Sequence, residues 1–371
     1  MSLRELTPDQ REIRDLAARF ADERIAPRAA EWDRAHTFPR ELFTELGELG
    51  LMGVCVPDEH GGAGAGFLAY VLVLEELARA DAGVGVTVAV HTSACALPLL
   101  AHGTPEQVER LVPPLASGAE IGAFALTEAG AGSDAGALRS RAVDDRISGA
   151  KQWITNGSHA ATFIVFARDG DGISAFVVRA GAEGFAVTRE EEKMGLNSSS
   201  TADLALDETP AELLGQRGRG MSIALRTLDG GRIGIAAQAV GIAQAALELA
   251  SDYAKQRIAF GAPIARKQAV QFRLAELATE IEAARLLTYR AAISKDAGRR
   301  ITMEAAMAKL FASEVAVRAA DAAVQIHGGL GFIEETAVAR HYRDAKILTI
   351  GEGTSEIQKM VIGRALGLES D

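Results

Sequence analysis

Residues 161–179 read ATFIVFARDGDGISAFVVR, and this stretch decides the fold class. Two runs rich in β-branched and aromatic residues, 161–168 and 173–179, are separated by a short segment of Asp and Gly. This pattern predicts strands divided by turns. Similar short segments occur at 121–127, 151–157, 185–190 and 202–207. The sequence therefore predicts a small β-domain over residues 121–220.

On both sides of the β-domain the pattern is helical. The opening TPDQ places Thr7 at an N-cap, Pro8 at the first helical position and Gln10 where a capping box requires it. Helical stretches continue to about residue 115, broken by the Gly-rich segment 58–66. Long amphipathic runs at 221–256, 264–297 and 302–326 indicate a helical bundle. We therefore predict a mainly α protein with a central β-domain, divided into 1–120, 121–220 and 221–371.

Composition narrows the class of protein. The 371 residues are 48% hydrophobic, with a net charge of −11 and no run of Lys or Arg, so a globular enzyme is expected and nucleic acid is not an expected partner. Cys55 and Cys95 lack CxxC spacing, which favours neither disulfides nor a metal cluster and fits a reducing cytoplasm. No leader and no apolar run of membrane-spanning length is recognised, so neither export nor a membrane span is expected. Segregated strands and the lack of a GxGxxG motif argue against a doubly wound nucleotide fold.

Two segments of the middle region are candidate ligand loops. FALTEAGAGSDAGAL (124–138) offers backbone N–H groups and hydroxyl donors to an anion or a polar ring, although such a turn alone is more often an ordinary loop. KQWITNG (151–157) pairs a Trp with a Thr, although a half-buried aromatic on a sheet is the simpler explanation when the motif is taken alone.

Two further segments lie in the helical C-terminal region. KQRIAFGAPIARKQAVQF (255–272) predicts a helix corner with Gly261 as the C′ glycine and Pro263 after it, and this leaves the Arg and Gln unexplained. AVQIHGGLGF (323–332) ends a helix in glycines that allow a ligand to approach the backbone or simply turn the chain. His327 by itself is more often structural than catalytic.

The last candidate is LTIGEGTSEIQ, residues 348–358. Ser355 and Gln358 match a capping box, so a helix should begin directly after Glu352 and Gly353. A helix N-terminus favours an anion. Taken alone, Glu352 is more simply a surface acid that complements the helix dipole.

Five segments, 124–134, 151–157, 257–268, 325–332 and 351–358, together resemble the acyl-CoA dehydrogenase family across essentially the whole chain. Residues 227–250 and 339–347 are most similar to its short-chain, bacterial-type branch. The resemblance implies an N-terminal helical domain, a middle β-barrel-like domain and a C-terminal four-helix bundle. It also implies a homotetramer, a dimer of dimers, with FAD at the subunit interfaces.

The resemblance assigns residues to FAD in two groups. Those expected to cover the flavin or lie on its phosphate side are Phe124, Leu126, Thr127, Gly132, Ser133, Trp153, Ile154, Thr155, Thr354 and Ser355. Those expected to bind the FAD of a neighbouring subunit are Arg257, Phe260, Gln268, Gln325, Gly328 and Gly329. The acyl-CoA substrate is expected to contact Ser133, Asp229, Arg232, Gly351 and Gly353.

The implied reaction is α,β-dehydrogenation of a saturated acyl-CoA to trans-2-enoyl-CoA, with hydride transfer to flavin N5. Members place the base either in the turn of Glu352 or directly before the helix arginine, here Gly231. Because glycine cannot act as a base, Glu352 is the expected catalytic residue, oriented by Arg232 and loosely solvated until substrate expels water. Gly351 stands where the family often has Tyr, which predicts room for a longer or branched acyl chain. The expected electron acceptor is electron-transfer flavoprotein.

Two alternatives remain open at this point. A protein of the same fold could pass electrons to O₂, as an acyl-CoA oxidase or flavin monooxygenase. From a different class, the chain could be a non-catalytic acyl-CoA-binding protein. Peroxide production under air would identify the first, and a flavin-free protein the second.

Overall fold

The N-terminal region is helical and begins where the capping pattern predicts. The computed structural model describes residues 6–368. The Thr7 side chain accepts from the Gln10 N–H (3.2 Å), while the Gln10 side chain accepts from the Thr7 N–H (3.0 Å), so the capping box is confirmed. The helical elements of this region are α1 (Pro8–Phe20), η1 (Ala21–Ile25), α2 (Ala29–Ala35), α3 (Arg40–Glu48), η2 (Asp58–His60), α4 (Gly66–Ala80), α5 (Ala82–Ala89), η3 (Val90–Ala96), α6 (Leu97–His102) and α7 (Pro105–Ala116).

The middle region is the predicted β-domain. Its strands are β1 (Gly122–Ala125), β2 (Arg141–Val143), β3 (Arg146–Thr155), β4 (Thr162–Asp169), β5 (Gly172–Arg179), β6 (Phe185–Glu190), β7 (Thr201–Pro210) and β8 (Glu212–Leu214), with the short turn η4 (Ala135–Ala137) before β2. They form one sheet in the order β6-β7-β3-β2-β4-β5-β8, and β1 pairs with β4 in parallel. The quoted stretch 161–179 supplies the antiparallel pair β4 and β5, joined by a tight turn at Gly170 (φ 61°). Their side chains alternate between two apolar clusters, one on each face.

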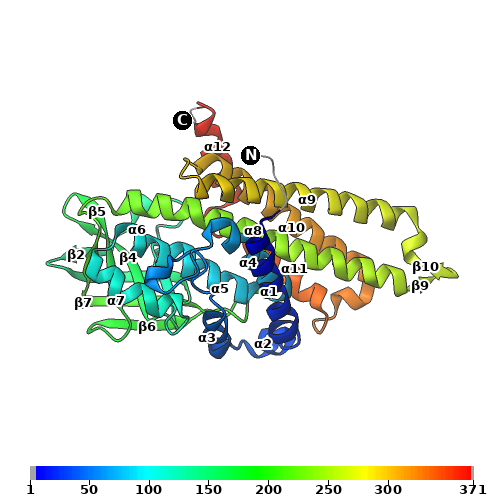
Figure 1. Cartoon of the computed structure of the whole chain (residues 1–371), viewed down its shortest axis with the longest axis horizontal. Helices are drawn as coiled ribbons and strands as arrows, with labels where there is room; N and C mark the ends of the chain where they lie inside the picture. The colour runs from blue at the N-terminus through cyan, green and yellow to red at the C-terminus, as the bar shows by residue number, and fades with distance from the viewer. Residues whose placement is uncertain (1–5, 369–371) are drawn as a thin grey trace.

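The C-terminal region is built from long helices. They are α8 (Gly220–Gln256), α9 (Gln268–Asp296), α10 (Thr302–His327), α11 (Ala337–Ile347) and α12 (Ser355–Ala365). Between α8 and α9 the chain forms a hairpin of β9 (Ile258–Ala259) and β10 (Ala262–Pro263), followed by η5 (Ile264–Arg266); η6 (Gly328–Phe332) follows α10. Figure 1 shows the sheet of the middle region at one end of the elongated molecule and the β9–β10 hairpin at the other.

The hairpin corrects one structural expectation. Gly261 is not the C′ glycine of α8, because α8 ends at Gln256 and two residues of strand follow Arg257. Phe260 (φ 53°) and Gly261 (φ 77°) are instead the two central residues of the hairpin turn. Two successive positive φ angles are what a two-residue turn matched to strand twist requires.

Close helix packing joins the N-terminal region to the bundle. A Cβ on Gly241 of α8 would lie 2.3 Å from the Glu75 carbonyl oxygen of α4, so only glycine permits this approach. A Cβ on Gly234 would lie 2.8 Å from the Tyr70 hydroxyl oxygen. The helices α4 and α8 therefore pack closely at these two glycines of α8.

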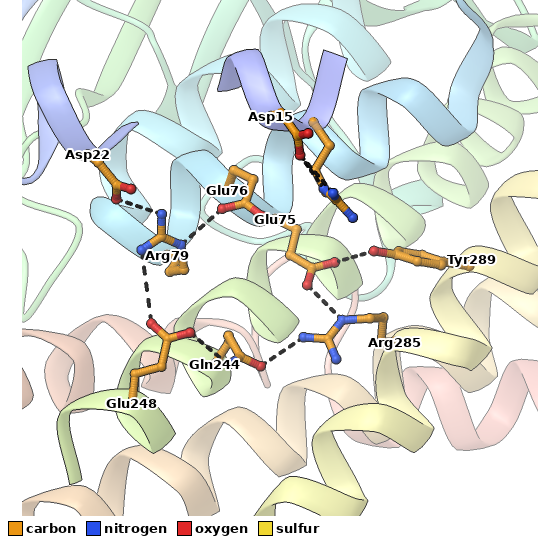
Figure 2. Close-up of polar contacts among 10 residues, drawn as sticks. Asp15, Asp22, Glu75, Glu76, Arg79, Gln244, Glu248, Arg285 and Tyr289 are labelled. Atoms are coloured by element: carbon orange, nitrogen blue, oxygen red, sulfur yellow. Dashed lines mark hydrogen bonds and ion pairs between the residues drawn. The ribbon is translucent and has the colours of Figure 1, made fainter. Parts of the chain in front are cut away.

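A polar network completes this junction. Figure 2 shows Glu75 accepting from Arg285 Nε (2.8 Å) and from the Tyr289 hydroxyl (2.8 Å), both on α9. Arg285 also donates to Gln244 Oε1 of α8 (2.9 Å). The nearby Arg79 bonds Glu76 on its own helix. Three helices thus share one set of charges, with Glu75 largely buried and fully partnered.

Two helical stretches meet the length and hydropathy expected of a membrane span, contrary to the sequence reading. They are residues 82–102 and 220–256, and 83% and 78% of their most apolar windows are buried inside the protein. Burial of that extent is typical of core helices. Within residues 6–368, no group of three or more His, Cys, Asp or Glu side chains is arranged to hold a metal ion.

Candidate active site

Glu352 lies in a tight turn between α11 and α12. Both Glu352 (φ 54°) and Gly353 (φ 90°) have left-handed backbone conformations. A left-handed glutamate is uncommon and costs energy, so the surrounding structure must hold it. Gln358, fully buried one turn into α12, donates to the carbonyl oxygens of Glu352 (3.1 Å) and Gly353 (2.8 Å). The turn is therefore fixed from its own following helix.

The start of α12 differs from the expectation by one residue. Thr354, not Ser355, is the N-cap, and its hydroxyl accepts from the Ile357 N–H (3.3 Å). Ser355 is the first helical residue and is buried, and its own N–H donates to the Thr349 carbonyl (3.0 Å). The Ser355 and Ile357 N–H groups are thus already bonded within the protein. The prediction that Ser355 caps the helix is therefore wrong.

The Glu352 carboxylate points at α8 and rests against Gly231. A Cβ built on Gly231 would lie 2.7 Å from Oε2, 2.9 Å from Cδ and 3.1 Å from Oε1 of Glu352. Residues 231 and 352, the two positions at which the family can place its base, are therefore in contact in the fold. The glycine at 231 provides the room that the carboxylate occupies.

The electrostatic state of Glu352 also differs from the expectation. Within residues 6–368 the Glu352 Oε2 is buried and has no hydrogen-bond partner, while the residue as a whole is half-buried. Burial raises the pKa of Glu352 to about 7, and the positive charges of Arg232 and Lys309 oppose that shift. One carboxylate oxygen is thus already removed from water by the protein itself, so the carboxylate is less solvated than expected before a substrate arrives.

Arg232 makes no hydrogen bond to the Glu352 carboxylate. Its Nη1 donates to Asp229 Oδ1, 2.7 Å away on the same helix, and the other Asp229 oxygen accepts from the Thr302 hydroxyl (2.7 Å). Arg232 Nε is buried and has no partner in the part of the chain that the structure describes. Arg232 therefore acts on Glu352 through its charge, while an unpaired N–H remains available in the same region.

Lys309 of α10 was missed by sequence reasoning. It is fully buried, and its Nζ donates to the Gly353 carbonyl oxygen at 2.6 Å. A single lysine within an alanine-rich helix gives no local signal, because the turn it contacts lies 44 residues further along the chain.

In the middle domain, a buried ion pair fixes the loop after β1. Lys151 Nζ of β3 donates to Glu128 Oε1 (2.7 Å) and to the Leu126 carbonyl (3.2 Å). Glu128 also accepts from the backbone N–H groups of Arg139 and Ser140. Burial opposes the effect, but the hydrogen bonds from Lys151 and Ser140 lower the pKa of Glu128 to about 2. The loop is therefore pinned at its base, while Gly132 and Ser133 at its tip are exposed.

Trp153 stands out from the neighbouring strand at a bulge. The register between β3 and β7 shifts between Lys151 and Ile154, and Trp153 has φ 58°. A positive φ on a bulky residue requires support, which here includes a bond from its N–H to Asp203 Oδ1 (3.1 Å). The indole is 56% exposed, whereas Ile154 is buried in the sheet. Phe124, Leu126, Thr127 and Thr155 are half-buried or buried nearby on β1, the loop that follows it and β3.

The remaining predicted residues gather at the far end of the bundle. Tyr253 of α8 stacks on His327 of α10 with ring centroids 4.2 Å apart, which brings the ends of these helices together. His327 bonds the Ala323 carbonyl, as expected of a structural histidine. Around this junction lie the exposed residues Arg257, Phe260, Gln268, Gln325, Gly328 and Gly329. Arg232 and Arg257 are separated by about 37 Å along α8, at 1.5 Å per residue.

These features suit a large, flat and anionic cofactor. An exposed indole next to a loop of backbone donors can cover an aromatic ring system, and a charged, amide-rich surface can hold the polar remainder. Since the two surfaces lie at opposite ends of a long helix, they would have to serve different cofactor molecules within one chain.

The chain matches known proteins over its full organisation. Residues 7–119, 123–209 and 218–367 match the family models described as the N-terminal, middle and C-terminal domains of acyl-CoA dehydrogenase. It is 47% identical over 370 residues to the mitochondrial short-chain specific acyl-CoA dehydrogenase of Bos taurus, covering 96% of this chain and 90% of that protein.

Two solved structures are similar throughout. Butyryl-CoA dehydrogenase from Megasphaera elsdenii has a TM-score of 0.95 and 44% identity, covering 98% of this chain and 99% of that one. A chain in a structural study of the electron transferring flavoprotein of Acidaminococcus fermentans has a TM-score of 0.96 and 45% identity, covering 98% of both.

Fold and site together define an FAD-dependent oxidoreductase that acts on CH–CH groups. The chain belongs to the acyl-CoA dehydrogenase family. The predicted fold class and enzyme class are thereby confirmed.

Proposed function

We propose that this protein dehydrogenates short-chain acyl-CoA thioesters at the α,β-position, with Glu352 as the base that accepts the α-proton. The observation that carries the proposal is the Glu352 Oε2, buried without a partner against Gly231. A carboxylate with an unused lone pair and a pKa near 7 is suited to take a proton from a weak carbon acid at neutral pH. No donor occupies the atom that would receive the proton.

The chain's own residues would perform three tasks. Gln358 and Lys309 hold the turn that carries Glu352, Gly231 leaves space for its carboxylate, and the Asp229–Arg232 pair presents polar groups beside it. Ser133, Gly351 and Gly353 would contact the thioester or CoA. FAD, when bound, supplies the acceptor for the hydride that leaves the β-carbon.

The far-end residues support an oligomer in the proposed function. Since Arg257, just beyond the end of α8, lies about 37 Å from Arg232 along that helix, and Phe260 and Gln268 follow it in the chain, a second copy would bring these residues to the flavin of the first. Phe260 is 96% exposed and Phe332 is 87% exposed, and a subunit interface would bury such side chains. We propose a homotetramer, a dimer of dimers, in which each FAD is held by residues of two chains.

The depth of the site supports a short acyl chain. Gly231, Gly234 and Gln238 follow one another on one face of α8. Beyond Glu352 this face is covered by Tyr70, which is fully buried and donates to the Ala89 carbonyl (3.1 Å), and by Gln238, which is fully buried and donates to the Ala82 carbonyl (3.0 Å). We infer from these two side chains that the acyl tail is short.

The site is open on the side toward Gly351. A Cβ on Gly351 would meet no atom closer than 3.7 Å, so the side toward Gly351 has room. We propose that the enzyme prefers acyl chains of about four carbons. Of the longer or branched chains predicted from Gly351, the proposal keeps the branched ones.

The proposed acceptor is electron-transfer flavoprotein, as suggested by the similarity to a chain from a study of that protein. Use of O₂, as in an oxidase or monooxygenase, is the competing possibility. A cytoplasmic location, suggested by the cysteine usage, also remains a proposal.

The test is a turnover profile of the purified yellow protein with C4 to C12 and branched acyl-CoAs. It would be run with an artificial acceptor, with electron-transfer flavoprotein, and under air with peroxide detection. The proposal predicts the highest kcat/KM for C4 or branched C4–C5 substrates, reduction of electron-transfer flavoprotein and little peroxide. A maximum at C8 to C12 would refute the proposed depth of the site, and peroxide at the rate of substrate consumption would refute the acceptor.

A further inference from the structure

Lys309 is an unusual residue for the centre of a helical bundle. Lysines are rarely buried unless they are paired with a carboxylate, because removing an ammonium group from water is costly. Lys309 is 0% exposed, yet within residues 6–368 no carboxylate oxygen lies within 4.0 Å of its Nζ. Among the described residues, its hydrogen-bond acceptor is the Gly353 carbonyl oxygen, at 2.6 Å. The cost of burying the ammonium group without a carboxylate partner indicates that its contact with the Gly353 carbonyl has a function.

The contact falls on the strained part of the active-site turn. The Gly353 carbonyl receives two donors, Lys309 Nζ from α10 and Gln358 Nε2 (2.8 Å) from α12. Gln358 also bonds the Glu352 carbonyl. Hydrogen bonds from two helices thus hold Glu352 and Gly353 in their left-handed conformations. One donor, Gln358, is neutral, and the other, Lys309, is charged.

The charges that face Glu352 come from three surrounding helices. Arg232 lies on α8 and Lys309 on α10, while the phenol of Tyr70 on α4 is also close enough to sense the Glu352 charge. Arg232 is already paired with Asp229 at 2.7 Å. Glu356, on the exposed side of α12, adds a weaker negative charge near Lys309. Of the two cations beside Glu352, Arg232 is paired with a carboxylate, whereas Lys309 contacts none among residues 6–368.

We propose that Lys309 is a positioning residue for the base: it clamps the Glu352–Gly353 turn through the Gly353 carbonyl, and its positive charge keeps the buried Glu352 carboxylate available to accept a proton. The inference rests on the proposed role of Glu352. Burial lowers the pKa of Lys309 to about 8, and the negative charge of Glu352 opposes that shift, so the ammonium form prevails at neutral pH.

Two substitutions of similar size distinguish the effect of the Lys309 charge from the effect of the hydrogen bonds that hold the Glu352–Gly353 turn. Lys309→Met removes both the charge and the bond to the Gly353 carbonyl, whereas Gln358→Leu removes bonds to the same turn without changing charge. We expect both to lower kcat. Only Lys309→Met should move the acid limb of the kcat/KM profile upward, by about one pH unit, because one of two opposing cations is lost. Lys309→Arg, which keeps the charge, should leave the limb within a few tenths of a unit of the parent.

The measurements use the flavin-loaded full chain, with flavin content and thermal unfolding recorded for each variant. Isotope-edited infrared difference spectra between pH 5 and 9 would follow the Glu352 carboxyl directly, as the band missing in Glu352→Gln. If Lys309→Met does not fold, the comparison of Lys309→Arg with Lys309→Gln, which keeps a donor but not the charge, replaces it.

An upward shift in the variants without charge, in both the kinetic limb and the infrared titration, supports the inference. An unshifted limb, or an equal shift in Gln358→Leu, overturns it and leaves Lys309 a structural residue. If the acid limb of the parent persists in Glu352→Gln, the assignment of the base fails instead, so the two failures are distinguishable.

Discussion

Replacing Gly231 by Ala tests whether the Glu352 carboxylate occupies the space that glycine leaves on α8. The new Cβ would lie 2.7 Å from Oε2 and 2.9 Å from Cδ, whereas an ordinary carbon contact needs at least 3.4 Å. The carboxylate must therefore move by about 0.7 Å or rotate away, since the α8 backbone is held by its neighbours. A displacement of 1 Å at a reacting group can cost about a hundredfold in rate, so we expect kcat to fall by roughly thirty- to a hundredfold.

Stability should change in the opposite direction. Alanine in a helix interior is favoured over glycine by about 1 kcal/mol, and the atoms that must move belong to the end of a flexible side chain. The assay is steady-state turnover of butyryl-CoA together with thermal unfolding of the flavin-loaded protein. Gly363→Ala on α12, where a Cβ would meet no atom within 4 Å, is the matched control and should keep the parent rate. Parent activity in Gly231→Ala would refute the placement of the carboxylate against α8.

Three further predictions follow from the same contacts. The kcat/KM for butyryl-CoA should rise with pH and level off above about 7, because burial raises the pKa of Glu352 to about 7 and only its deprotonated form accepts a proton; equal values at pH 5 and pH 8 would contradict this. Lys151→Met should lower the free energy of unfolding, measured by denaturant titration, by about 3–5 kcal/mol, because it leaves Glu128 buried without its partner. The double variant Lys151→Met, Glu128→Gln should recover part of that loss. A cost below about 1 kcal/mol in the single variant would show that the pair is dispensable. Thr354→Ala should cost about 1 kcal/mol, whereas Ser355→Ala should not remove a cap; the opposite order would restore Ser355 as the capping residue.

Local patterns were sufficient to predict the elements that local physics determines. The capping box at Thr7, the antiparallel pair within 161–179 and the long helices of the bundle all follow from residue type and spacing alone. Where two readings compete over one or two residues, the pattern was less reliable. Thr354 and Ser355 both cap helices well, and only the backbone conformation of the folded chain decides between them.

The contacts that define the site lie between distant segments and leave no local signal. Lys309 meets Gly353 across 44 residues, and Lys151 meets Glu128 across 23. The burial of Glu352 depends on Gly231 in a helix more than a hundred residues earlier. For this reason the candidate base could be named through the resemblance to the family, whereas its burial and the hydrogen bonds that hold its turn could be seen only in the fold.

The most direct test of the central claim is reduction of the bound flavin by butyryl-CoA in the Glu352→Gln variant. The amide keeps the size of the side chain but cannot accept the α-proton. Mixed anaerobically with butyryl-CoA at matched flavin content, the variant should lose its flavin absorbance at least about a hundredfold more slowly than the parent. Bleaching at the parent rate would contradict the assignment of Glu352 as the base.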